Sequence, residues 1–312
     1  MNMLTQWLRK RDADLNTAVC IDSAGVTLAE VRWADGRPQL IECDVHPTLA
    51  DDANAALQQA AKRAGVHDCA TVMPIGSYSL LLIEAPEVPA PELRAAVRWR
   101  IRDLIDFHVD DAVLDVFDAP ASGARGQTHL YVVVSRSSEV KALADRLQDA
   151  GIKLGVIDIP ELALRNIAAR LPEDEQGVAL LYFGEQRGVI ALCRNQTLYL
   201  ARTLEVGQQR LREAVADGQT EALFDALALE VQRSLDYYDR HFQQAPISQL
   251  VIAPLGEPVE GLVETLHSNL GLGVRPLKLT EIVDGAEHVT PAQASDCLLA
   301  LGAALRREST SL

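Results

Sequence analysis

This sequence of 312 residues has few aromatic residues, few cysteines and no long apolar run, and each absence excludes a class of protein. Aromatic residues make up 4% of the chain, too few for a surface that stacks the bases of single-stranded nucleic acid. The five cysteines include no C-x-x-C pair and lie in or next to apolar runs, which is typical of buried free thiols in a reducing compartment. No apolar run reaches the roughly 18 residues of a membrane-spanning helix, and the first residues lack the apolar segment of a signal peptide. The composition predicts a folded cytoplasmic protein.

Basic residues are also scarce. The chain has 29 Lys and Arg against 44 Asp and Glu, which gives a formal net charge of -15. Such a charge repels phosphate backbones, and no concentrated basic patch offsets it, so nucleic acid is not an expected partner. The sequence contains no G-x-x-x-x-G-K-[ST], H-E-x-x-H or G-x-S-x-G motif, and its seven histidines are scattered. No catalytic residue and no metal site is predicted.

What the sequence does contain is one pattern that occurs twice. Three strands joined by two short turns are followed by a helix and then by a further strand. The residues are 17–45, 51–65 and 69–75 for the first copy, and 178–207, 221–242 and 249–254 for the second. Two interpretations are open: an internal duplication, or two ordinary α/β pieces of similar order. Both predict an α/β fold with two lobes around a cleft.

Between the two copies lies an insert, residues 78–150, with a pattern of its own. A strand, a helix at 91–106, two further strands and a second helix predict a small α+β subdomain. Within it, 120–127 is the most linker-like stretch and is expected to be a mobile hairpin loop. The predicted division of the whole chain is a basic N-terminal arm at 1–16, a first lobe at 17–77 and 151–175, the insert at 78–150, and a second lobe at 176–312 that includes a helical part at 208–245.

The N-terminal arm, "MNMLTQWLRKR", combines Trp7 and Leu8 with three basic residues that follow them. This pattern suits a segment that lies on an anionic membrane surface. It equally suits a disordered chain start.

Four segments, in this order, resemble the family of the type IV pilus assembly protein PilM. They are "LTQWLRKRDADLNTAVCIDSAGVTLAEVRW", "EAPEVPAPELRAAVRWRIRDLIDFHVDDAVLDVFD", "ALEVQRSLDYYDRH" and "CLLALGAALR". More narrowly they resemble its members in mannose-sensitive haemagglutinin (MSHA) pilus systems, and the resemblance covers nearly the whole chain. It implies the actin-like ATPase fold, shared with the cell-division protein FtsA and the cytoplasmic domain of the secretion protein GspL. In that fold two related lobes each contribute a hairpin to one nucleotide cleft.

The resemblance also implies which residues would bind phosphate, because the two hairpin turns offer backbone N–H groups with an acidic residue beside each. In the first hairpin, Asp22 stands at the position of the acid, and Ser23 and Gly25 belong to a turn about two residues shorter than that of the family. In the second, Tyr182 stands where the family has an acid, two residues before Gly184. Glu185 is a substitute acid or a solvated turn residue.

On the adenosine side, Glu230 and Arg233 match the acidic and basic positions of the fold, with a surface ion pair as the alternative. The loop "IAPLGEP" has Ala253 and Pro254 where the family has glycines, and Gly256 still permits close backbone approach. These departures predict that ATP binding is weakened or lost.

Finally, the resemblance implies a partner: the cytoplasmic N-terminal peptide of an inner-membrane protein of the PilN type, held in a groove beside the insert. Apolar and acidic residues of the first insert strand and the turn after it suit a basic, hydrophobic peptide, with a solvated acidic face as the alternative. The residues are Leu80, Leu82, Glu84, Glu87 and Glu92. The expected function is a cytoplasmic docking protein at the inner face of the inner membrane, attached through this partner or also through the arm. The alternative is a working ATPase or a sugar-kinase-like phosphotransferase.

Overall fold

The first large sheet is formed by residues from both sides of the insert. The structure, a computed structural model, describes residues 15–22, 25–47, 53–65, 68–122 and 127–307. The strands of this sheet are β1 (Leu15–Ile21), β2 (Gly25–Ala34), β3 (Arg37–Pro47), β4 (Cys69–Val72) and β8 (Leu154–Asp158). Their order is β3-β2-β1-β4-β8; the first three strands pair antiparallel, and β4 and β8 add on in parallel. Leu15 and Asn16, which the sequence assigned to the arm, belong to β1, and the rest of the arm lies outside the described residues.

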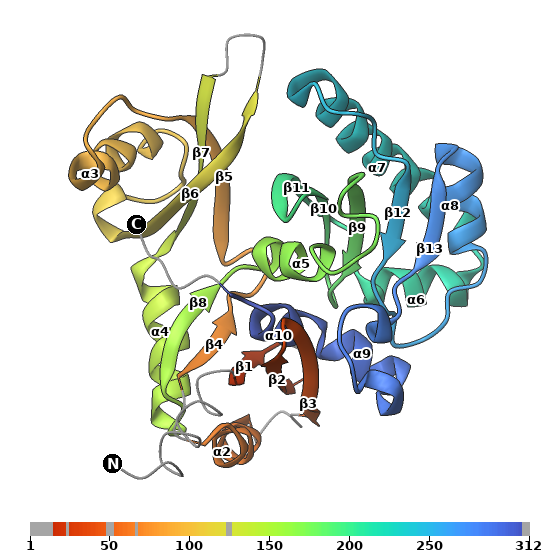
Figure 1. Ribbon diagram of the computed structural model, residues 1–312, viewed down its shortest axis with the longest axis horizontal. Coiled ribbons are helices and arrows are strands. Elements are labelled where there is room, and N and C mark those ends of the chain that lie inside the picture. Colours follow the sequence, from red (N-terminus) through yellow and green to blue (C-terminus); the bar gives the residue numbers. More distant parts are fainter. Residues whose placement is uncertain (1–14, 23–24, 48–52, 66–67, 123–126, 308–312) are drawn as a thin grey trace.

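The second large sheet repeats this arrangement (Figure 1). Its strands are β9 (Val178–Phe183), β10 (Gly188–Arg194), β11 (Thr197–Leu204), β12 (Gln249–Ile252) and β13 (Gly273–Pro276). The order β11-β10-β9-β12-β13 and the strand directions match those of the first sheet strand for strand. The two predicted three-strand units are confirmed.

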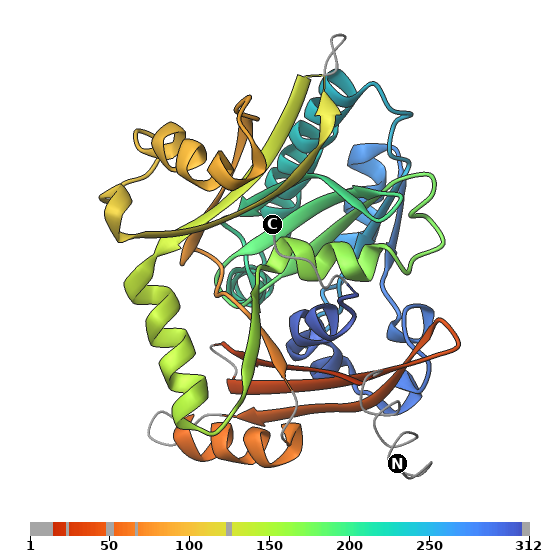
Figure 2. The same ribbon diagram turned by 60° about the vertical axis from the view of Figure 1, so that its left-hand side comes forward.

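Helices cover the outer face of each sheet, as Figure 2 shows. Their apolar residues recur every three or four positions, which places them on one side of each helix. The first sheet is covered by α2 (Ala53–Ala64) and by the end of α4 (Ser137–Asp149), and the second by α6 (Gln208–Asp217), α7 (Thr220–Phe242) and α8 (Leu262–Leu270). The predicted helices at 51–65 and 221–242 are confirmed as α2 and α7, the first ending before Gly65 at a φ of 67°.

Two helices each pack on the sheet of the opposite half, and their contact with each other joins the two halves. They are α5 (Pro160–Ala168), which follows β8 of the first sheet but packs on the second, and α10 (Leu298–Ala304), which follows α9 (Pro291–Asp296) and packs on the first. At their crossing, an added Cβ on Gly302 would lie 2.4 Å from the carbonyl oxygen of Ala163, so only glycine permits this approach. The buried side chain of Asn166 donates to the Gly302 carbonyl at 2.9 Å.

The insert forms a third sheet, with one face packed on a helix. The strands β5 (Tyr78–Glu84), β6 (Ala112–Ser122) and β7 (Gln127–Arg136) have the order β5-β7-β6, and α3 (Ala90–Ile101) covers one face. The predicted helix at 91–106 is too long: α3 ends at Ile101, and Leu104, which a continued helix would place on the same side as Val97 and Ile101, is 57% exposed. The predicted loop at 120–127 is also too long, because β6 continues to Ser122; residues 123–126 lie outside the described residues.

The other face of the insert sheet meets the second large sheet through aromatic residues. The rings of Phe117 and Tyr131 stack with centroids 5.1 Å apart, and the Tyr131 hydroxyl donates to the carbonyl of Tyr199 in β11 at 2.8 Å. The remaining short elements are the 3-10 helices η1 (Val109–Asp111), η2 (Leu279–Glu281) and η3 (Ala286–His288). No helix among the described residues is both long and apolar enough to cross a membrane.

Candidate functional site

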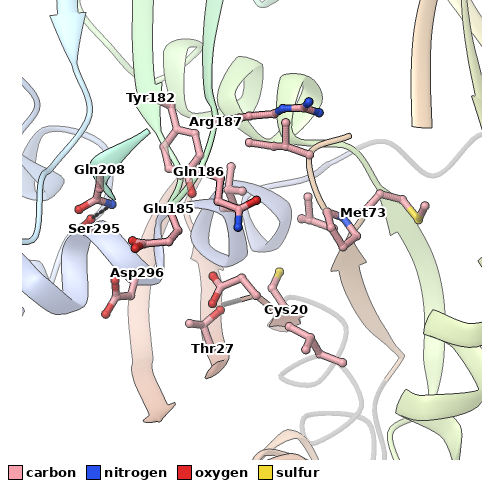
Figure 3. A pocket seen from close by; sticks show the side chains of 17 residues that line it. Cys20, Thr27, Met73, Tyr182, Glu185, Gln186, Arg187, Gln208, Ser295 and Asp296 are labelled. Carbon is pink, nitrogen blue, oxygen red and sulfur yellow. Dashed lines mark hydrogen bonds between the residues drawn. The ribbon is translucent and has the colours of Figure 1, made fainter. Parts of the chain in front are cut away.

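A cavity of about 340 Å³ lies where the two large sheets face each other (Figure 3). Its walls come from four places: the β1–β2 hairpin, the chain after β4, the β9–β10 turn, and α9 with the start of α6. The sequence reasoning pointed to both hairpins. Of the predicted residues, the cavity is lined by Asp22, Gly184 and Glu185, together with Tyr182.

The first hairpin turn is held by Asp22. Its backbone N–H donates to the Gly25 carbonyl at 2.9 Å, and its carboxylate accepts the Gly25 N–H at 3.1 Å. Because Ile21 pairs with Val26, only four residues join the strands. Ser23, a predicted ligand, lies outside the described residues.

The second hairpin turn is closed by the equivalent backbone hydrogen bond. Gly184 N–H donates to the Arg187 carbonyl at 2.9 Å, and Phe183 pairs with Gly188, so again four residues join the strands. Counting from the strand pairs, Gly184 is the counterpart of Asp22. The second turn therefore offers no side chain at the position where the first has a carboxylate.

Tyr182 points into the cavity from β9 and is almost fully buried (Figure 3). Burial, and then the nearby charge of Asp22, raises the pKa of its phenol well above the ordinary value, so the group stays neutral. A neutral phenol does not replace a carboxylate as a ligand for a cation.

Two further carboxylates, Glu185 and Asp296, stand at the inner end of the cavity. Glu185 forms an ion pair with Arg212 of α6. Burial, and then the charge of Glu185, raises the pKa of Asp296 above its ordinary value. Within the described parts of the chain, no three His, Cys, Asp or Glu side chains are arranged to bind a metal ion.

Gln208, the first residue of α6, ties the parts of the site together. Its Nε2 donates to the Phe183 carbonyl and to the Ser295 hydroxyl, each at 3.0 Å, and its Oε1 accepts the Gly256 N–H at 3.3 Å. Sequence reasoning missed this residue, because a glutamine at a helix start has no spacing that reveals such distant partners.

The start of α6 is also bonded to the second turn through its backbone. The N–H groups of Gln208 and Gln209 donate to the carbonyls of Gly184 and Glu185, at 2.8 and 2.9 Å. Gly207 permits this contact, since an added Cβ there would lie 2.5 Å from the Glu185 carbonyl oxygen. These donors of the helix N-terminus, which elsewhere hold anions, are occupied by the protein itself.

A second cavity, of about 360 Å³, lies on the other side of Gln208. It is lined by Gly256 and its neighbours and by α6, including Leu211 and the half-exposed Val215, and it shares Glu185, Gln208 and Asp296 with the first cavity. These three side chains divide one cleft into two chambers.

Glu230 and Arg233, which were expected to face an adenosine, line neither of these two chambers. They lie on α7 and pair with each other, with Arg233 Nη1 2.5 Å from Glu230 Oε1. The ion-pair interpretation is the one that the geometry supports.

Arg187 is a second residue that sequence reasoning missed. Its guanidinium reaches across the cavity mouth, and Nη1 lies 2.6 Å from the position that a Cβ on Gly76 would occupy. It also pairs with Glu205 at 3.2 Å. The side chain of Ile75 meets Gly184 beside it, with Cδ1 3.5 Å from the corresponding Cβ position. The second turn is thus in contact with the chain that leads into the insert.

The predicted partner residues lie on β5, on the turn after it and on the first turn of α3. Leu80 is half-buried, Leu82 is 36% exposed, and Glu84 is exposed; all three point to the face of the insert sheet opposite α3. Glu87 and Glu92 are exposed in the following turn and the first turn of α3.

A third cavity, of about 580 Å³, lies where the insert joins the first large sheet. It is lined by Gly76 to Ser79, Leu104 to Phe107, the end of β7 and Glu139. None of the five predicted partner residues lines it. Sequence reasoning missed this hollow because it forms between segments that are distant in the chain.

Comparison with solved structures assigns the fold. A Bacteroides thetaiotaomicron protein with an actin-like ATPase fold matches with a TM-score of 0.51 and 12% identity over 94% of this chain and 98% of that one. The ethanolamine utilization protein EutJ of Carboxydothermus hydrogenoformans matches with a TM-score of 0.50 and 13% identity over 93% of this chain and 89% of that one. The chain has the actin-like ATPase fold.

A more similar structure is a PilM–PilN type IV pilus biogenesis complex. It matches with a TM-score of 0.72 and 22% identity over 93% of this chain and 97% of that chain. No protein-family model and no curated protein sequence matches this chain.

Proposed function

We propose that this protein is a docking protein of a type IV pilus assembly complex, of the MSHA type whose member is MshI. In this proposal it works at the inner face of the inner membrane and holds the cytoplasmic N-terminal peptide of a PilN-type partner. The observation that carries the proposal is the likeness to a PilM–PilN complex, which extends over nearly the whole chain and includes the insert.

The proposal treats the cleft as a degenerate nucleotide site, because its residues do not fit magnesium ATP. A phosphate cradle needs free backbone N–H groups and an acid beside each turn. Here the N–H groups of Gly184, Gln208 and Gln209 are bonded within the protein. Only the first turn has an acid at its first position; Glu185 of the second turn is paired with Arg212, and Gln208 occupies the Gly256 N–H on the adenosine side.

Charge supports the choice of partner. A cytoplasmic segment next to a membrane span is usually rich in Lys and Arg. Glu84, Glu87 and Glu92 are exposed on the end of β5, the turn after it and the start of α3, and Leu80 and Leu82 share the face of β5 with Glu84. A basic peptide with a hydrophobic run therefore suits this surface, and its main chain has a free edge of β5 to pair with, since β5 is the outer strand of its sheet.

The experiment that tests the function combines two titrations of the purified chain. Calorimetry with magnesium ATP is expected to give no binding heat, and fluorescence anisotropy with a labelled PilN-type N-terminal peptide is expected to give saturable binding. A magnesium-dependent ATPase rate that Asp22→Ala abolishes would instead support the ATPase alternative.

A variant series locates the peptide. Leu82→Glu and Glu84→Lys are each expected to weaken the peptide about ten-fold, or about 1.4 kcal/mol, with little change in melting temperature because both sites are exposed. Leu229→Glu, at a 52% exposed leucine of α7, is the control and is expected to bind like the parent. If Leu104→Glu weakens binding while the two β5 variants do not, the peptide lies in the third cavity, which Leu104 lines, and the assignment to β5 is wrong.

A further inference from the structure

Exposed apolar side chains gather on the insert. Of the eight large apolar residues that are exposed in the described parts of the chain, five belong to it, although it is less than a quarter of the sequence. They are Leu82, Val88, Trp99, Leu104 and Val113. Such a concentration indicates a surface that another component covers.

Trp99 is the most exposed of them, at 69%. It lies on the outer side of α3, since Val97 and Ile101, two residues before and after it, are fully buried against the insert sheet. Figures 1 and 2 show α3 at the periphery of the molecule, away from both large sheets. The ring is therefore presented to solvent on the outside of the insert.

Arginines surround Trp99. Residues 94–102 contain four arginines and no acid, in a chain whose net charge is -15. The guanidinium of Arg102 lies 6.0 Å from the ring centroid of Trp99. This helix face combines a large amphipathic ring with positive charge.

Three of the four guanidinium groups make contacts at the exposed surface. Arg94 pairs with Asp115 at 3.0 Å and Arg102 with Asp103 at 3.2 Å, while Arg100 donates to the Glu84 carbonyl at 3.2 Å. Exposed pairs of this kind contribute little free energy, so these groups exchange them readily for another anion. Arg98 differs, because it donates to the carbonyls of Val109 and Ala112 and holds α3 to the chain before β6.

We propose that this face of α3 rests on a membrane surface of anionic lipid, with the Trp99 ring among the headgroups and Arg100 and Arg102, which flank it, on their phosphates. Arginine binds phosphate in a planar, two-pronged geometry, and tryptophan prefers the boundary between headgroups and acyl chains. Neither Trp99 nor the α3 arginines line any of the three cavities described above, which favours a lipid surface over a protein partner that would hold the ring in a pocket. The acids Glu92 and Asp103 nearby limit the affinity and make the contact dependent on anionic lipid.

The test uses Trp99 as its own reporter. The chain has three tryptophans, so Trp7→Phe with Trp33→Phe leaves Trp99 as the single fluorophore. Vesicles that contain phosphatidylglycerol are expected to shift its emission to shorter wavelength, with quenching by lipids brominated on the acyl chains. Vesicles of phosphatidylcholine alone, or high salt, are expected to abolish both effects.

A charge-reversal pair separates α3 from the N-terminal arm. In vesicle sedimentation, Arg100→Glu with Arg102→Glu is expected to lower the bound fraction about ten-fold, whereas Arg233→Glu with Arg240→Glu on α7 is the matched control and leaves it unchanged. Removal of residues 1–14 is expected to leave the Trp99 shift in place. Unchanged Trp99 emission with anionic vesicles overturns the proposal, and a shift with polyglutamate but not with vesicles assigns the face to an acidic protein instead. Neither result depends on whether the PilN-type peptide binds.

Discussion

The two large sheets have the same strand order, but helices bury the second sheet more completely than the first. In the second sheet every residue of β9 and β10 is buried, and the 23 residues of α7 lie across its outer face. In the first sheet, the 12 residues of α2 give less cover, and β3 has one buried residue, Pro38. The same strand order therefore carries two cores of different size, and topology alone does not set the stability of each half.

The two hairpin turns also share their closing hydrogen bond but differ in the side chain at its first residue. Both are closed by the same backbone hydrogen bond, but Asp22 in the first is matched by Gly184 in the second. The first turn keeps a polar side chain at the cavity. The second turn is packed against α6 and the chain near Ile75, so its geometry serves to join parts of the protein.

The largest expected effect comes from the joint that both halves share. Gly302→Ala would place a methyl group 2.4 Å from the Ala163 carbonyl oxygen, and we expect the separation of α5 and α10 to cost about 3 kcal/mol of unfolding free energy. Urea denaturation followed by circular dichroism measures it. Gly256→Ala is the control, since the nearest atom to its added Cβ is a glutamine side-chain oxygen at 3.5 Å. Equal midpoints for the two variants would show that the joint is not closely packed.

The next prediction compares the two cores directly. Leu192 in β10 and Leu28 in β2 are both fully buried, one in the larger cluster under α7 and one in the smaller cluster under α2. We expect Leu192→Ala to cost about 4 kcal/mol and Leu28→Ala about 2.5 kcal/mol, because a thinner core collapses more easily around a cavity. The same denaturation experiment checks this. A larger loss at Leu28 would reverse the comparison.

A pH titration distinguishes two carboxylates, Glu161 and Glu173, whose pKa values shift in opposite directions. Glu161 of α5 is buried beside the first sheet and accepts from the Tyr78 hydroxyl at 2.5 Å. Burial raises its pKa above the ordinary value, so the stability it contributes is greatest below the unfolded pKa and is lost as pH rises through the folded pKa. Glu173 is the opposite case, because its bonds to Arg275 lower its pKa, and its contribution is lost as pH falls through the folded value.

We therefore expect Glu161→Gln to raise the melting temperature at pH 7 and to flatten its dependence on pH above the ordinary glutamate range, since an amide still accepts from Tyr78. Glu173→Gln is the matched variant and is expected to lower the melting temperature at pH 7. Thermal scans from pH 4 to 8 compare them. A drop at pH 7 in both variants would mean that the two carboxylates have the same role.

The smallest effect is expected on the outer surface of the second half. Glu230 and Arg233 form an exposed pair, so Glu230→Ala should change the unfolding free energy by about 0.5 kcal/mol or less. Calorimetry with magnesium ATP is expected to be the same for the variant and the parent. If the parent binds ATP with a measurable heat and this variant does not, Glu230 and Arg233 do contact the adenosine.

Much of the fold could be predicted from local patterns. Alternation of apolar residues identified both three-strand units, and the spacing of Phe224, Leu227, Val231 and Leu235 identified α7. The hairpins that reach the cleft, with Asp22 and Gly184, followed from the resemblance to a known family. Errors fell at element ends, as at Leu104, where the helical pattern continues but the helix does not.

The sequence by itself determined the strands, the outer helices and the repeated order, because those depend on which face of each segment is apolar. Only the tertiary structure decided the exchange of α5 and α10, the position of Gln208 between two chambers, the exclusion of Glu230 from the cleft, and the Tyr131 bond to the second sheet. Each of these features is a contact between residues far apart in the sequence, or depends on how the chain runs between two elements. Local periodicity carries no information about such pairs, because it fixes which side of a segment is buried but not which segment covers it.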